Sequence, residues 1–335
     1  MTSRILLLAA SLPLLVAAET HRVQPTRYYR TFFHGHPVLE RLRPGDRVAT
    51  TTIDASGYDE QNIKRSEPFN PLTGPFYVEV AEPGDALVVR FERVRPSRTW
   101  GFTNFRLLLS SLLPDAVAAI YSNRYKQDLV RPGVDTQVPW DLDMIRGIAR
   151  LREPASTRMK MELPMKPMLG CVGVAPAGDF APTSGPSGSY GGNMDYNEMG
   201  EGATVYLPVY HPGALLFIGD GHALQGDGEP TGTGIEVPME VEFTVDLRKA
   251  AKLAGPRVET AEYIISVGSQ PEFSSSLDRG LQIATTDMVR WLASEYGLED
   301  WAAHLLVGYQ AKYDVVTVMG SMALKIPKRF LPTPR

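Results

Sequence analysis

Carboxylates and an imidazole gather in one short stretch of the chain, between Gly191 and Glu236. Eight acidic or imidazole side chains of the stretch are candidates for a functional site: Asp195, Glu198, Glu201, Asp220, His222, Asp227, Glu229 and Glu236. Oxygen and nitrogen ligands of this kind bind divalent cations, and the glycines between them let the backbone come close to a site. The alternative is a set of Asp/Gly turns whose carboxylates only cap backbone amides.

Two apolar runs, residues 203–209 and 214–218, separate these polar clusters. Both runs are short and bounded by Gly or Pro, which predicts buried strands joined by a turn. If the strands pair as a hairpin, Asp195 falls on the same edge as Asp220 and His222. The last two stand at i and i+2, so they share one strand face if the strand continues. We therefore expect these three residues to bind one metal ion.

The chain begins with a segment typical of a secretory signal. Residues 1–18 contain one Arg, a Leu/Ala-rich run and small residues near Ala18, where cleavage is expected. This predicts an exported protein, periplasmic or extracellular. No later stretch reaches about 18 unbroken apolar residues, so we expect no membrane span. The net charge of −4 provides no basic surface, so we expect no nucleic-acid partner.

Cys171 is the only cysteine of the chain, so no intramolecular disulfide can form even in an oxidising compartment. Its apolar neighbours predict a buried strand thiol that acts as a small hydrophobe rather than as a nucleophile. The sequence contains neither G-x-S-x-G nor C-x-x-C. Serine and thiol mechanisms therefore have little support.

Strand and turn patterns dominate residues 19–254. The chain has 27 prolines and 30 glycines, and a strand–Pro-Gly-Asp–strand unit occurs at 44–46 and again at 83–85. Residues 237–247 alternate apolar and polar side chains, as a half-buried strand does. We expect a mainly-β catalytic domain over residues 19–254, built of antiparallel sheets in a sandwich or barrel-like arrangement.

The pattern changes in residues 255–335. Residues 277–296 place apolar side chains at i, i+3 and i+4, which predicts an amphipathic helix that ends at Gly297. A second helix is expected over 298–309. Two further strands are expected at 313–319 and 322–326. We interpret this part as an α/β subdomain of the same fold unit, with a role in scaffold or subunit contact rather than in chemistry.

Several long motifs resemble one known family, in the family's order. They read RPGDRVATTTIDASGYD, NPLTGPFYVEVAEPGDALVV, PMLGCVGVAP, GGNMDY, TVYLPVYHPGALLFIGDGHALQGDGEPTGTGIE and KIPKRFL. From about Pro37 to the C-terminus the chain resembles the acetamidase/formamidase family of metal-associated amidohydrolases. The resemblance implies a mostly β fold, hydrolysis of small carboxamides to acid and ammonia, and a homo-oligomer. Related members act on cyclic amides, which is the alternative substrate class.

The resemblance also implies where a metal is held. It places the ion near the GNMD and GDGH motifs, which contain Asp195, Asp220 and His222, with Asp54 and His36 as candidate ligands from the amino-terminal half. Zn²⁺ is the expected ion, and Ca²⁺ is the alternative. A different reading remains open, in which a secreted, non-catalytic β-sandwich keeps the metal for structure or binds a ligand such as a carbohydrate.

Amide hydrolysis requires an activated water, a polarised carbonyl and a proton for the departing amine. A bound divalent cation lowers the pKa of water from 15.7 towards about 7, and a nearby carboxylate can take the proton and pass it on. Glu229 suits this second role because Gly226 and Gly228 permit a close approach to the substrate. Asp227 is the next candidate. Alternatively, Glu229 is an additional metal ligand or an ordinary loop carboxylate.

Overall fold

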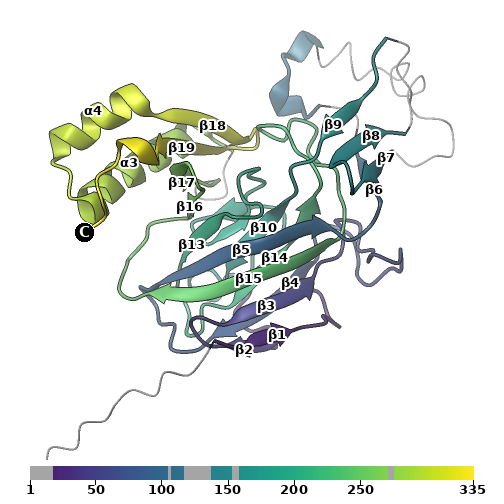
Figure 1. Cartoon of the computed structure of the whole chain (residues 1–335), viewed down its shortest axis with the longest axis horizontal. Coiled ribbons are helices and arrows are strands. Elements are labelled where there is room, and N and C mark those ends of the chain that lie inside the picture. Colours follow the sequence, from purple (N-terminus) through teal and green to yellow (C-terminus); the bar gives the residue numbers. More distant parts are fainter. Residues whose placement is uncertain (1–17, 105–106, 117–136, 153–157, 271–274) are drawn as a thin grey trace, which may run out of the picture.

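The computed structural model describes residues 18–104, 107–116, 137–152, 158–270 and 275–335. In this part of the chain strands outnumber helices and form three sheets, and two α-helices lie near the C-terminus (Figure 1). The expected mainly-β fold with a small α/β part is therefore confirmed. Residues 1–17 of the predicted signal lie outside the described residues. No helix among the described residues is long and apolar enough to cross a membrane.

The largest sheet has nine strands, and its order mixes early and late parts of the chain. From one edge to the other the strands are β1 (Thr20–Arg22), β3 (Arg47–Thr51), β15 (Met239–Arg248), β5 (Ala86–Pro96), β13 (Thr204–Pro208), β16 (Arg257–Glu259), β17 (Tyr263–Gly268), β19 (Ser321–Pro327) and β18 (Lys312–Thr317). Buried and more exposed residues alternate along most of β15. The half-buried strand predicted from residues 237–247 is therefore confirmed.

A six-stranded sheet packs against the first. Its strands are, in order, β11 (Ser187–Gly188), β12 (Gly191–Asn193), β10 (Met168–Val174), β14 (Leu216–His222), β4 (Leu72–Val78) and β2 (Glu40–Leu42). The main core lies between the two sheets: the rings of Phe76 on β4 and Phe243 on β15 meet edge to face at 5.4 Å. This packing of two faces is that of a β-sandwich.

The predicted hairpin of residues 203–209 and 214–218 is wrong. β13 pairs with β5 and β16 in the nine-stranded sheet, whereas β14 pairs with β10 and β4 in the six-stranded sheet. The segment between them crosses from one sheet to the other, a distance of about 10 Å between packed sheets. Sequence alone does not distinguish the two arrangements, because both strands are buried whichever neighbours they have.

A smaller, four-stranded antiparallel sheet lies beside the sandwich (Figure 1). Its strands are β6 (Trp100–Thr103), β7 (Val138–Asp143), β8 (Ile148–Leu151) and β9 (Glu162–Pro164). The sheet is joined to the rest by a bridge between Phe102 and Glu236, in which each backbone N–H donates to the other's carbonyl oxygen. The bridge places this sheet directly beside the acidic stretch of the chain.

The C-terminal part continues the nine-stranded sheet rather than forming one of its own. Helix α3 (Leu277–Tyr296) starts at Ser276, whose hydroxyl accepts from the backbone N–H of Arg279, and ends at Gly297 with φ 63°, as predicted. It packs on β17 and β19. Helix α4 (Asp300–Gln310) follows, and short 3₁₀ turns lie at Leu109–Ser111 and Lys328–Phe330.

Candidate metal centre

Five buried side chains form one cluster. Ligand atoms of Asp195, Asp220 and His222 lie within 4.8 Å of one another, and so do those of His222, Glu229 and Glu236. The two groups share the imidazole. The structure therefore brings together the three residues expected to bind metal and the expected proton acceptor, Glu229. It adds Glu236, which the sequence did not single out.

Strand β10 brings the first two carboxylates together. It pairs with β12 on one side and with β14 on the other, so the residues at the ends of these strands meet across it. A Cβ added to Gly170 of β10 would collide with Asp195 Oδ1 and lie 2.6 Å from Asp220 Oδ2. Only glycine leaves room for both carboxylates. The predicted proximity thus arises through a third strand, without the hairpin from which it was inferred.

The backbone is unusual at three cluster residues. Asp195, Asp220 and Glu229 have φ values of 48°, 56° and 46°. The left-handed region is uncommon for residues other than glycine, although Asp tolerates it better than most. Such conformations persist where the surrounding structure enforces them, and they concentrate at functional sites. The fold therefore holds these carboxylates in place at some conformational cost.

Gln225 determines which nitrogen of His222 faces the cluster. Its Nε2 donates to the carbonyl oxygen of Asp195 at 2.6 Å, so its Oε1 must be the atom 2.8 Å from His222 Nδ1. Nδ1 therefore carries the proton, and Nε2 faces the carboxylates, 3.1 Å from Glu236 Oε1 and 3.6 Å from Asp220 Oδ1. A second partner of this kind orients a metal-binding histidine.

Two asparagines each fix one oxygen of an aspartate. Asn193 Nδ2 donates to Asp195 Oδ2 at 2.7 Å, and Asn70 Nδ2 donates to Asp220 Oδ2 at 3.0 Å. The buried thiol of Cys171 donates to Asn193 Oδ1, and burial raises the pKa of this thiol well above its ordinary value. Cys171 is therefore a structural residue behind the cluster, which agrees with its expected role as a buried strand thiol.

Four cluster atoms are buried and have no hydrogen-bond partner among the described residues: Asp195 Oδ1, Asp220 Oδ1, His222 Nε2 and Glu236 Oε2. Each such buried polar atom costs about 1–3 kcal/mol. Three carboxylate oxygens and one imidazole nitrogen in one buried cluster are a possible donor set for a divalent cation. Glu229 contributes no such atom and, at 8% exposed, is the least buried of the five residues.

Burial and mutual repulsion perturb every pKa resolved in the cluster. Burial raises the pKa of Glu229 to about 7 and that of Glu236 to about 8. It also raises the pKa of Asp195, with a further contribution from the charge of Glu229. Burial alone would lower the pKa of His222, but the carboxylates of Glu236 and Asp220 outweigh it and raise that pKa. Four carboxylates exceed the charge of one imidazolium, so a bound cation would relieve the repulsion.

Two expected ligands lie apart from the cluster. Asp54 forms a buried ion pair with Arg98 at 2.9 Å, which occupies its carboxylate. His36 lies with its Nε2 2.7 Å from Thr31 Oγ1, and its ring stacks on Tyr29 at 3.9 Å. Neither residue belongs to a metal-ligating group within the described residues. Both side chains instead have structural partners.

Asp227 also lies outside the cluster. It is exposed, and its Oδ1 accepts from Asn197 Nδ2 at 2.7 Å. Two other acidic residues of the stretch form ion pairs, Glu198 with Lys325 and Glu201 with Arg95. The eight candidate groups of the stretch therefore divide into five that form the cluster and three that form hydrogen bonds or ion pairs elsewhere.

The C-terminal hairpin of β18 and β19 contacts both loops of the cluster. Tyr196, next to Asp195, donates its hydroxyl to Asp314 Oδ2 at 2.9 Å. Val318 donates its backbone N–H to the carbonyl oxygen of Gly228, next to Glu229, at 2.8 Å. The hairpin, expected to serve as scaffold, thus supports the site itself.

Sequence reasoning did not assign roles to Glu236 and Gln225. Glu236 had one available signal, its place at the end of the acidic stretch, but no spacing rule links it to His222 fourteen positions earlier. The structure pairs the two backbones in an antiparallel bridge. Gln225 had no signal, because an uncharged amide in a Gly-rich loop resembles any turn residue.

A family model described as the Acetamidase/Formamidase family matches residues 20–184 and 177–321. An acetamidase of Mycolicibacterium smegmatis is 28% identical over 220 residues, which cover 54% of each chain. A formamidase of Methylophilus methylotrophus is 28% identical over 253 residues, covering 64% of this chain and 62% of that protein. The chain thus spans less than two thirds of these relatives' lengths. The crystal structure of an acetamidase from Yersinia enterocolitica superimposes with a TM-score of 0.76 at 29% identity, covering 94% of this chain and 93% of the other.

Proposed function

We propose a function from the premise that this chain belongs to the acetamidase/formamidase family: it hydrolyses the carbon–nitrogen bond of a carboxamide, with one divalent metal ion in the cluster. One observation carries the proposal. Four buried ligand atoms without hydrogen-bond partners lie in one cluster with a fourth carboxylate, that of Glu229, which has no such atom. A metal kept only for structure would not require that additional buried carboxylate.

Asp195, Asp220, His222 and Glu236 would hold the ion. The imidazole and the three carboxylates favour Zn²⁺, and the excess of oxygen donors keeps Ca²⁺ as the alternative. When bound, the ion lowers the pKa of water and polarises the amide carbonyl. Gln225 keeps His222 Nε2 directed at the ion, and Asn193 and Asn70 hold the two aspartates.

Glu229 moves the proton in this proposal. It takes the proton of the attacking water and delivers it to the leaving nitrogen, so the water oxygen bonds to the carbonyl carbon and ammonia departs. A pKa of about 7 suits both steps, because the carboxyl group can accept and release a proton near neutral pH. Its greater exposure relative to the other four residues is consistent with contact with the substrate.

Ammonia release from formamide and acetamide tests the proposal. The purified protein is assayed as prepared, after chelation, and after Zn²⁺ or Ca²⁺ is restored, while bound metal is measured by elemental analysis. We expect activity to be lost with the metal and to return with one ion per chain. A protein that binds one ion per chain and releases no ammonia from any amide supports the non-catalytic alternative.

Export and assembly are further proposals. Glu19 donates its backbone N–H to Asp46 Oδ1 at 2.9 Å, so cleavage after Ala18 would place a charged amino terminus beside this carboxylate. The intact mass of protein from its native host tests for a start at Glu19.

Helix α4 exposes an apolar stripe at i, i+4 and i+8 that suits contact between copies: Trp301 68%, Leu305 51% and Tyr309 80% exposed. Light scattering with and without Leu305→Glu tests for a homo-oligomer.

A further inference from the structure

We infer that the preferred substrate is a primary amide whose acyl group is apolar and longer than that of acetamide, and that this group lies in a pocket between the metal centre and the four-stranded sheet. The inference rests on the proposed function and specifies its substrate class. The pocket has a volume of about 370 Å³. It combines an apolar wall with a wall whose residues contact His222 of the site.

The apolar wall comes from the four-stranded sheet. Val138 and Trp140 of β7, Leu151 of β8 and Leu163 of β9 line the pocket. Three of these strands therefore present apolar side chains towards one space, and none of the four residues is charged. A wall of this kind stabilises methylene groups and offers nothing to a second polar end of a substrate.

The opposite wall lies against the candidate metal centre. Gln225 and Gly234 line the pocket, and both also contact His222. Gln225 hydrogen-bonds to the imidazole, and a Cβ on Gly234 would collide with it. The backbone N–H of Gly234 also lies at the carboxyl group of Glu229. An acyl chain in the pocket would therefore direct its carboxamide towards the proton-transferring carboxylate.

The pocket is too large for the smallest amides. Acetamide has four non-hydrogen atoms, whereas a volume of about 370 Å³ falls in the range of about 300–1,000 Å³ found for sites that bind drug-sized ligands. Each substrate methylene that moves from water to an apolar wall raises the affinity of the substrate by about fourfold. Propyl, pentyl and phenyl groups would fill the space that formamide and acetamide leave empty.

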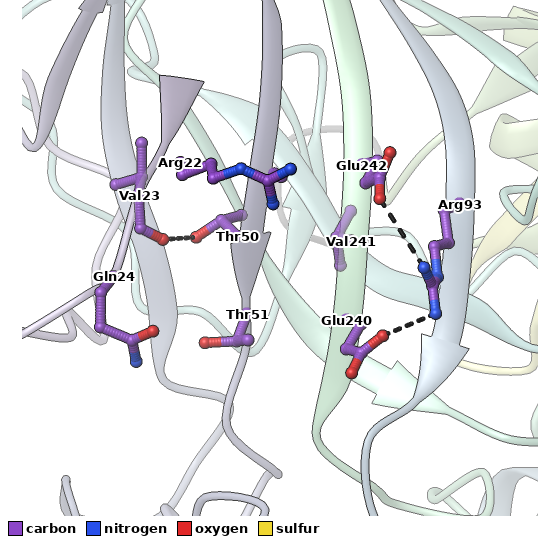
Figure 2. A pocket seen from close by; sticks show the side chains of 10 residues that line it. Arg22, Val23, Gln24, Thr50, Thr51, Arg93, Glu240, Val241 and Glu242 are labelled. Atoms are coloured by element: carbon purple, nitrogen blue, oxygen red, sulfur yellow. Dashed lines mark hydrogen bonds and ion pairs between the residues drawn. The ribbon is translucent and has the colours of Figure 1, made fainter. Parts of the chain in front are cut away.

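A second cavity of about 380 Å³ does not fit this role. It lies over β1, β3, β15 and β5 of the nine-stranded sheet, and charged side chains line it (Figure 2). Arg93 there lies 2.9 Å from Glu240 and 3.8 Å from Glu242. The charges of this cavity would disfavour an apolar acyl group.

The reaction keeps the same balance for every member of the class. Water adds its oxygen to the carbonyl carbon, the carbon–nitrogen bond breaks, and the products are a carboxylic acid and ammonia. Steady-state kinetics of the metal-loaded enzyme test the inference, with formamide, acetamide, butyramide, hexanamide and benzamide as substrates. We expect kcat/KM to rise by about fourfold per methylene until the pocket is full.

A pocket-filling variant locates the effect. Leu163 lies on the short strand β9 and is partly buried, so Leu163→Trp can fill the pocket with limited damage to the fold. We expect it to lower kcat/KM for hexanamide by at least about tenfold while leaving that for acetamide near wild type. Leu281→Trp on α3, at a position that is 39% exposed and does not line the pocket, is the matched control.

Binding separates this inference from the proposed function. Calorimetric titration of hexanamide and acetamide into the metal-loaded Glu229→Gln variant, with and without Leu163→Trp, measures affinity without turnover. If hexanamide binds more tightly than acetamide and Leu163→Trp abolishes this difference, the result supports the pocket. If, in addition, the wild type hydrolyses no amide, only the proposed function is overturned. If the enzyme hydrolyses acetamide but neither kcat/KM nor binding affinity rises from acetamide to hexanamide, only the inference is overturned.

Discussion

At the scale of single residues, the cluster separates two roles that the sequence left mixed. Four side chains of the cluster each contain a buried atom without a hydrogen-bond partner, and Glu229 lies beside them without such an atom. In the proposed function, the first role is to bind a cation and the second is to carry a proton. Substitutions that preserve shape but remove one property distinguish them.

Glu229→Gln keeps the shape and much of the hydrogen bonding of the side chain and removes its basicity. Because general-base catalysis contributes about 10²–10⁴-fold, we expect kcat to fall by that order while the metal content stays at the wild-type value. Steady-state kinetics and elemental analysis measure the two quantities. Asp227→Asn, which changes an exposed carboxylate of the same loop, is the control and should keep full activity. Loss of metal in Glu229→Gln would make this residue a ligand instead.

His222→Ala removes the imidazole around which both carboxylate groups are arranged. We expect it to lose bound metal and thermal stability together, since an ion that binds only the folded state adds to stability by mass action. His36→Ala is the matched control, because His36 has structural partners away from the cluster. Equal metal content in both variants and the wild type would contradict the assigned site.

At the scale of elements, strand β10 lies directly under the two aspartates of the site and separates the strands that lead to them. It lies between β12 and β14, so it determines how closely the two aspartate-bearing segments approach. The four-stranded sheet and the C-terminal hairpin then enclose the cluster from other sides through Phe102 and Val318. The site is therefore built where three sheets meet rather than on one loop.

Gly170→Ala tests this arrangement directly. The added methyl group would collide with Asp195 Oδ1 and crowd Asp220 Oδ2, so one of the two carboxylates must shift. A misplacement of about 1 Å costs on the order of 10²-fold in activity, and we expect kcat/KM to fall by about that factor. Gly308→Ala on α4, where a Cβ meets nothing within 4 Å, is the control. Wild-type kinetics in Gly170→Ala would show that the carboxylates do not need this spacing.

At the scale of the whole molecule, we expect the cluster to link stability to metal and to pH. Without a cation, the fold must bury four carboxylates close to one another. Burial raises the pKa of Glu229 to about 7 and that of Glu236 to about 8 in the folded state, from an ordinary 4.5. When folding raises the pKa of an acidic group, the fold is more stable at low pH than at high pH. At low pH the group is protonated in both the folded and the unfolded state.

We therefore expect the Tm of the metal-free protein to fall as pH rises from 4.5 to about 8. The raised pKa of His222 acts in the same direction, because its stabilising contribution is lost as pH passes its folded value. Each pKa unit corresponds to about 1.4 kcal/mol, so the fall should reach several degrees. Calorimetry on chelated and reloaded protein measures it. With metal bound, the ligand carboxylates stay ionised and the fall should be smaller; an identical fall in both forms would argue against a metal at the cluster.

Much of this molecule was predictable from local sequence. The alternation in residues 237–247, the helical spacing over 277–296 and its end at Gly297 each depend on side chains a few positions apart, and all three appear in the structure. The same holds for the chemistry of the acidic stretch, because residue types alone predict oxygen and nitrogen ligands. Long motifs in a fixed order also identified the family.

The strand partners and the residues of the cluster could be identified only from the tertiary structure. Periodicity reports that a strand is buried but not which strand it pairs with, so the predicted hairpin was wrong although the proximity inferred from it holds. Glu236 meets His222 only because their backbones pair, and Asp54 is kept from the cluster by Arg98. These outcomes depend on contacts between distant segments, whose energies are decided by the packing of the whole chain and not by local sequence.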